Sequence, residues 1–165
     1  MGMMLLKGNE TPQEIIYLAY GLEEGLRKFY SKSSKLAIDS AVVGVLSKLA
    51  EIEVKHKQRL YDLYLRIDAN PLNVEAFENN ISSVFMEGGY DPDRLMEQSM
   101  SEFQTAAGVL DFAMMLEAQA MDLYMRYAEK SKDPEVKNIF YNMADEEKAH
   151  LKSLGGILDK NLDSK

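Results

Sequence analysis

The sequence contains only two histidines, and a glutamate stands three residues before each of them. The first pair is Glu53 and His56, and the second pair, Glu147 and His150, lies 94 residues further along the chain. On an α-helix, side chains three residues apart share one face and lie about one turn from each other. A carboxylate and an imidazole at this spacing can bind one metal ion together. The repeated motif therefore predicts two related metal-binding helices.

Four long helices are predicted from apolar residues that recur with the helical period. Their expected ranges are 12 to about 36, 39 to about 69, about 105 to 130, and 133 to about Gly155-Gly156, which is expected to end or loosen the last helix. Thr11 with Glu14, Asp39, and Asp133 before a proline are typical residues for helix starts. Each apolar stripe contains one inward glutamate, and the four are Glu23, Glu53, Glu117 and Glu147. Glu24, beside the first of these, is expected to face water.

The repeat extends beyond the two histidine motifs. The same shift of 94 residues relates Glu23 to Glu117 and Tyr30 to Tyr124. The first two helices thus repeat as the last two, which predicts an all-α, four-helix bundle of two helical hairpins. A long crossover connection at about 70–104, with a short helix at 93–100, would join helices that run in parallel. Such a bundle brings together four carboxylates and two imidazoles, the ligand set of a di-iron or di-manganese site.

Two alternatives remain open on the residues alone. Four carboxylates in one core would be very costly to bury without a cation, which favours bound metal over a bundle that kept the pattern and lost its ions. Tyr30 and Tyr124 lie two turns beyond the lone glutamates on the same face. They either donate hydrogen bonds to ligand carboxylates or are ordinary core residues.

Composition excludes several classes of function. The chain has no cysteine, so these residues hold no disulfide, iron–sulfur cluster or thiol catalyst. A net charge of −8 argues against a nucleic-acid partner, because no basic face is available to neutralise phosphates. No apolar run reaches the roughly 18 residues that a membrane span needs, and the N-terminus lacks the features of a signal peptide. We therefore expect one domain over residues 1–165, located in the cytoplasm, without a membrane partner.

Taken together, these motifs resemble the ferritin-like superfamily and, within it, the rubrerythrin-like group. The resemblance rests on Leu22-Glu23 with Tyr30, Leu116-Glu117 with Tyr124, and two Ala-x-x-Glu-x-x-His motifs that begin at Ala50 and Ala144. It implies that Glu53 and Glu147 bridge two metal ions. It also implies that Glu23 and Glu117 are terminal ligands and that His56 and His150 each bind one metal.

The sequence departs from the rubrerythrin pattern in two places. Rubrerythrins carry a further ligand glutamate one turn before the residue that matches Glu117, and here that position is Met114. They also carry a four-cysteine rubredoxin domain, whereas this sequence has no cysteine. The six ligands that remain are the set shared with bacterioferritins. The segment from Ala19 to Tyr30 also resembles ferritin-like domains attached to rhodanese domains, which suggests a sulfur-transfer partner.

By this resemblance, the expected function is that of a non-haem di-iron oxidoreductase reacting with peroxide or dioxygen in oxidative-stress defence. Its electrons would come from an external donor, a rubredoxin or a reductase. One alternative is a ferroxidase that stores or detoxifies iron, as ferritins do. Another is a helical interaction module stabilised by its metal, partnering a rhodanese-like domain. Two iron ions are the expected cofactor, although manganese or zinc fit the same ligands. A homodimer or larger homo-oligomer is also expected.

Overall fold

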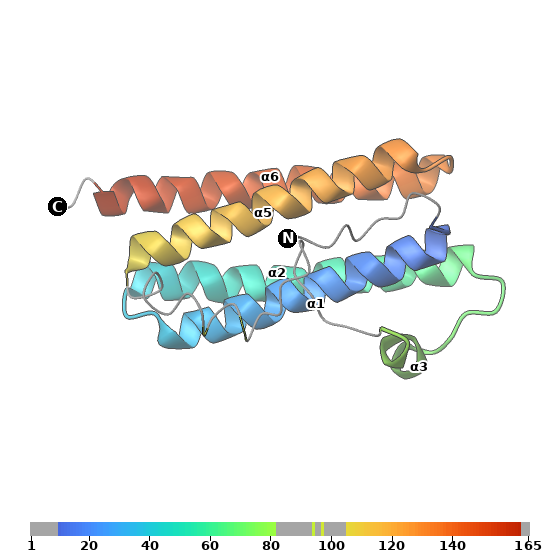
Figure 1. Cartoon of the computed structure of the whole chain (residues 1–165), viewed down its shortest axis with the longest axis horizontal. Helices are drawn as coiled ribbons and strands as arrows, with labels where there is room; N and C mark the ends of the chain where they lie inside the picture. The colour runs from blue at the N-terminus through green and yellow to red at the C-terminus, as the bar shows by residue number, and fades with distance from the viewer. Residues whose placement is uncertain (1–9, 82–93, 95–96, 98–104, 163–165) are drawn as a thin grey trace.

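The computed structural model describes residues 10–81, 94, 97 and 105–162. Four long helices dominate this part of the chain, as Figure 1 shows: α1 (Pro12–Leu36), α2 (Ser40–Ile67), α5 (Ala106–Lys130) and α6 (Pro134–Leu162). A short helix, α3 (Val74–Asn79), follows α2. The described residues contain no strand. The predicted all-α class is therefore confirmed.

The helices begin at the residues that the sequence indicates. The Thr11 hydroxyl accepts a hydrogen bond from the Glu14 N–H, and the Glu14 carboxylate accepts one from the Thr11 N–H, which completes a capping box. Asp39 caps α2, and Thr105 caps α5. Asp133 accepts hydrogen bonds from the first N–H groups of α6. These caps satisfy backbone donors that have no partner inside the helix.

The ends of two helices differ from the prediction. α2 ends at Ile67, two residues early, and Asp68 is its C-cap. α6 does not break at Gly155-Gly156 but continues to Leu162. Leu154 is fully buried, and the apolar residues that follow the glycines also pack on the core. This packing outweighs the poor helix propensity of glycine, which costs roughly 1 kcal/mol per residue.

The helices are arranged as two antiparallel hairpins. α1 packs against α2 and α5 against α6, and the hairpins meet where α2 faces α6 and α1 faces α5. In Figure 1, α2 and α5 run in the same direction, so α5 begins at the end of the bundle opposite the end where α2 finishes. A long connection is therefore required, as predicted. The predicted all-α bundle of two helical hairpins is confirmed.

α3 is an element of the connection that the sequence analysis did not predict. Its Phe77 is fully buried and contacts the rings of Tyr17, Tyr20 and Tyr64. The side chain of Tyr20 also donates a 2.5 Å hydrogen bond to Glu78. The helix expected at 93–100 lies outside the described residues, except for positions 94 and 97, which are helical and exposed.

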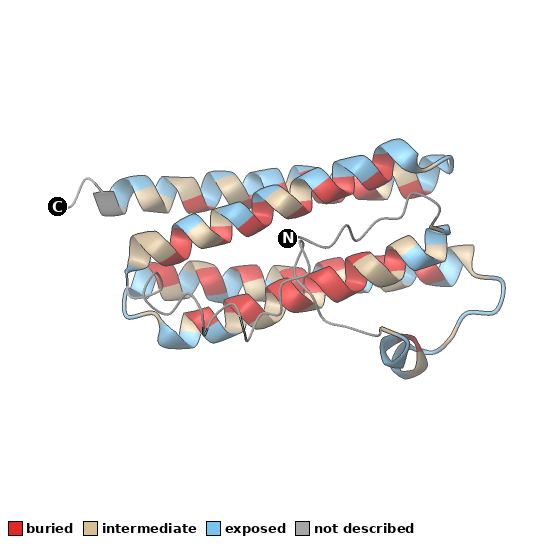
Figure 2. Ribbon diagram, viewed as in Figure 1, coloured by how far each residue is buried: buried red, intermediate tan, exposed pale blue. Residues whose placement is uncertain are grey.

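Buried side chains line the inner faces of all four long helices, as the red bands in Figure 2 show. Most of them are leucine, phenylalanine, tyrosine and alanine. The polar and charged residues among the buried set are Glu23, Ser33, Glu53, His56, Glu117, Glu147 and His150. Six of these seven are the predicted ligands. Within the described residues, no helix is both long enough and apolar enough to cross a membrane.

Candidate metal centre

The candidate site lies between the two hairpins, where each long helix contributes one buried glutamate. Glu23, Glu53, Glu117 and Glu147 all have side chains with no exposed surface. Exposed Glu51, only two residues before Glu53 on α2, shows that their burial follows from helical position rather than residue type. The helical period thus places all four carboxylates in the core, as the sequence indicated.

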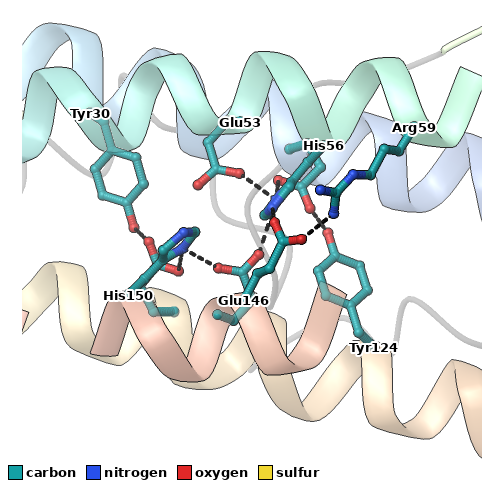
Figure 3. A network of polar contacts seen from close by, with 10 residues as sticks. Tyr30, Glu53, His56, Arg59, Tyr124, Glu146 and His150 are labelled. Carbon is teal, nitrogen blue, oxygen red and sulfur yellow. Dashed lines mark hydrogen bonds and ion pairs between the residues drawn. The ribbon is translucent and has the colours of Figure 1, made fainter. Parts of the chain in front are cut away.

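Four of the six side chains form a first group around the ring of His56. Figure 3 labels two of them, Glu53 and His56. Each of Glu23, Glu53, His56 and Glu147 offers one ligand atom, and these atoms all lie within 4.8 Å of one another. His56 Nδ1 is 3.0 Å from Glu53 Oε2, 3.1 Å from Glu147 Oε1 and 3.4 Å from Glu23 Oε2. The group has the size and composition of a site for one cation.

A second group surrounds His150 and shares two members with the first. It consists of Glu53, Glu117, Glu147 and His150, again with ligand atoms within 4.8 Å of one another. His150 Nδ1 is 2.7 Å from Glu147 Oε2 and 3.2 Å from Glu117 Oε2. Glu53 and Glu147 thus belong to both groups. The other two glutamates each belong to one group only.

Several buried oxygen atoms of the site lack a hydrogen-bond partner. They are Glu23 Oε2, both carboxylate oxygens of Glu53, and Glu147 Oε1. His56 Nδ1 lies 3.0–3.4 Å from three of these oxygens but makes no well-aligned hydrogen bond to any of them. A buried polar atom without a partner carries a desolvation cost of about 1–3 kcal/mol, and more for a charged group. All of these atoms belong to the two groups. The residues therefore fit bound cations, which would satisfy these atoms directly.

In the metal-free chain, the site holds protons. Burial raises the pKa of Glu53 well above its ordinary value, and the negative charge of Glu23 raises it further. Burial likewise raises the pKa of Glu117. Burial lowers the pKa of His150, but hydrogen bonds with Glu117 and Glu147 outweigh this effect and raise it to about 10. Metal binding at this site must displace protons, because the ligand forms are deprotonated.

Tyr30 and Tyr124 connect the hairpins through the two glutamates that belong to one group each. The Tyr30 hydroxyl, from α1, donates a hydrogen bond to Glu117 on α5. The Tyr124 hydroxyl, from α5, donates one to Glu23 on α1. Both tyrosines are fully buried. These contacts favour a role in orienting the carboxylates, which was one of the two alternatives left open by the sequence.

Replacing either tyrosine by phenylalanine tests that role, since the ring is kept and only the hydroxyl is lost. We expect Tyr30→Phe and Tyr124→Phe each to lower the free energy of unfolding by about 1–3 kcal/mol, measured by urea denaturation, because a buried carboxylate oxygen loses its donor. Tyr141→Phe is the control, since Tyr141 makes a similar bond to Glu129 at the surface. If all three variants behave alike, the buried tyrosines are ordinary core residues.

The sequence analysis missed Glu146, which lies beside the site. Its Oε2 is 2.9 Å from His56 Nε2, and its Oε1 accepts a hydrogen bond from Arg59 (Figure 3). The repeat gave no signal for this residue, because the position 94 residues earlier is Ile52. The signal that was present is its place directly before Glu147, within one helical turn of the histidine motif.

The expectation that Glu24 faces water is wrong. Its side chain is 16% exposed and is bound by Arg27 of α1 and Lys57 of α2. Burial raises the pKa of Glu24, but hydrogen bonds from Arg27 and Lys57 outweigh this and lower it to about 2. Glu24 thus stays outside the metal groups and pairs the first two helices instead.

The fold and the site together define a class: an all-α bundle of two hairpins with a candidate carboxylate–histidine metal centre in its core. Residues 108–164, which contain most of α5 and all of α6, match the family model described as Rubrerythrin. The resemblance to this ferritin-like di-iron family is therefore confirmed over the second hairpin. Neither the comparison with curated proteins nor the comparison with solved structures finds a match.

Proposed function

We propose that this protein is a non-haem di-iron carboxylate oxidoreductase that reacts with hydrogen peroxide or dioxygen. The observation that carries the proposal is the pair of overlapping groups that share Glu53 and Glu147 in a fully buried setting. Bound ferrous ions would supply two electrons to the O–O bond of the oxidant. The match of residues 108–164 to the Rubrerythrin model supports the same class of chemistry.

In this proposal, the residues of the chain hold and orient two cations and keep water away. Glu53 and Glu147 would bind both cations, while Glu23 with His56 and Glu117 with His150 would each complete one position. Four carboxylates balance the charge of two divalent cations, so the loaded core would be electrically neutral. Tyr30 and Tyr124 keep the outer carboxylates in place through their hydrogen bonds. Bulk water is excluded because five of the six proposed ligand side chains have no exposed surface.

The electrons and the substrate would come from outside these residues. The sequence has no cysteine, so a rubredoxin or reductase that returns electrons to the site would be a separate partner. Hydrogen peroxide and dioxygen are small enough to reach a buried site without a large cleft. We propose one domain for the chain, active as a homodimer or larger homo-oligomer.

The experiment is metal analysis followed by peroxide titration of the reduced protein. Protein purified without added metal should contain two iron ions per chain. After anaerobic reduction, one peroxide should oxidise two ferrous ions, with two protons consumed and two waters formed. Iron that reacts with neither peroxide nor dioxygen would overturn the proposal in favour of a metal-stabilised interaction module. Oxidation inside a closed shell of many subunits, seen by light scattering, would favour ferroxidase and storage instead.

A further inference from the structure

The internal repeat is broken at a position that contacts the candidate metal centre. The shift of 94 residues relates the six proposed ligands in pairs, but it relates Glu146 to Ile52 and Arg59 to Ser153. Glu146 and Arg59 contact each other beside His56. The His56 half of the site therefore has an outer pair of charged residues that the sequence does not repeat at the corresponding positions for His150.

Glu146 holds the His56 ring from the side opposite the carboxylates. His56 Nδ1 faces Glu23, Glu53 and Glu147, while its Nε2 lies 2.9 Å from Glu146 Oε2. A carboxylate at this distance accepts a hydrogen bond from Nε2–H, so that Nδ1 is the nitrogen that would bind a cation once its own proton is displaced. Arg59 in turn donates to the second oxygen of Glu146 and fixes its orientation. The direction of the ring is thus fixed before any cation arrives.

His150 is held less firmly. Within the part of the chain that the structure describes, its hydrogen bonds, with Glu117 and Glu147, both involve Nδ1, the atom that faces the site. The position that the repeat relates to Glu146 is Ile52, whose side chain has no hydrogen-bonding atom. The His150 side chain is also 10% exposed, whereas that of His56 is completely buried. The two histidines therefore differ in support and in contact with water.

We propose that the two metal positions are unequal, with Glu146 as the positioning residue that makes the His56 position the tighter one. Divalent cations fill the His56 position first, and the His150 position binds the second, more readily exchanged cation. This inference rests on the proposed two-metal site but not on its redox activity. The loss of an outer hydrogen-bond partner from a ligand histidine typically costs about 10–100-fold in metal affinity, which sets the expected difference between the positions.

Stepwise addition of Co²⁺ to the metal-free chain measures this difference, with calorimetry giving affinities and visible absorbance reporting ligand geometry. We expect two binding steps separated by about 10–100-fold in Kd. His150→Gln should remove the weaker step, and His56→Gln should remove the tighter one. The reverse assignment would overturn the proposal, as would two steps of equal affinity.

Variants of the outer partner then test its role directly. Glu146→Ala should weaken the tighter step by about 10–100-fold and leave the weaker step nearly unchanged, so that the two become similar. Ile52→Glu, which restores the repeat, should strengthen the weaker step. Asp145→Ala is the matched control, because it removes one negative charge from the neighbouring exposed position of α6.

The proposal would be overturned if Glu146→Ala and Asp145→Ala weakened the tighter binding step equally. Glu146 would then act only through its negative charge. The proposed function fails separately. Two cations that bind as expected but never react with peroxide or dioxygen would contradict the oxidoreductase alone. A wild-type chain that binds no divalent cation would contradict both.

Discussion

Glu53→Gln is expected to reduce the bound metal from two ions per chain to fewer than one. Glu53 belongs to both groups, and its fully buried carboxylate lies 3.0 Å from His56 Nδ1. Glutamine keeps the shape of the side chain but removes a negative charge from both positions at once. Metal analysis after dialysis measures the loss, and circular dichroism checks that the helices persist.

Two further variants make this expectation specific. Glu117→Gln changes a residue that belongs only to the His150 group, so it should release one ion and keep the other. Glu51→Gln removes the same charge from an exposed position of α2 and should retain both ions. Two ions retained in Glu53→Gln, or equal losses from the buried and exposed variants, would contradict the shared role of Glu53.

Glu53→Leu is expected to have opposite effects on the stability of the metal-free and metal-loaded protein. In the metal-free chain, the substitution removes a buried carboxyl group that is crowded by the carboxylates of Glu23 and Glu147, and with it the desolvation cost of that group. The free energy of unfolding should therefore rise by about 1–3 kcal/mol. In the presence of metal, the wild type should gain stability, by about 2.7 kcal/mol when the free metal is 100 times its Kd, and the variant should not. Thermal unfolding with and without a chelator measures both effects.

The control for this second prediction is Glu51→Leu, which places the same side chain at an exposed position of the same helix. It should leave the stabilisation by metal intact. A Glu53→Leu chain that is less stable than the wild type even without metal would show that the carboxyl group supports the fold by itself. That result would contradict the interpretation of the buried carboxylates as residues retained for cation binding.

Most of the fold could be predicted because local signals and the repeat agreed. Thr11, Asp39 and Asp133 are strong capping residues, and the caps they form are those observed. The apolar stripes of the sequence predict Glu23, Glu53, Glu117 and Glu147 in the core, where the structure has them. Two independent patterns, helical period and a 94-residue shift, thus gave the same inner face for every long helix.

The features that were missed depend on contacts between elements distant in sequence. α3 is only one and a half turns long, and it is held by the packing of Phe77 among tyrosines of α1 and α2, which no local pattern reveals. Glu24 is partly buried because Lys57, on a different helix, forms a salt bridge with it. Glu146 contacts both His56 and Arg59, and the repeat does not indicate its role because the related position, Ile52, is not a glutamate. Contacts of this kind, between side chains on different helices, can be identified only once the helices are packed together.

Each candidate metal position consists of three side chains from one hairpin and a single glutamate from the other. The first takes Glu147 from α6, and the second takes Glu53 from α2. Neither half of the molecule can therefore assemble a complete position by itself. Cations bound there would link the two hairpins to each other. Their loss would therefore weaken the packing between the hairpins before any individual helix unfolds.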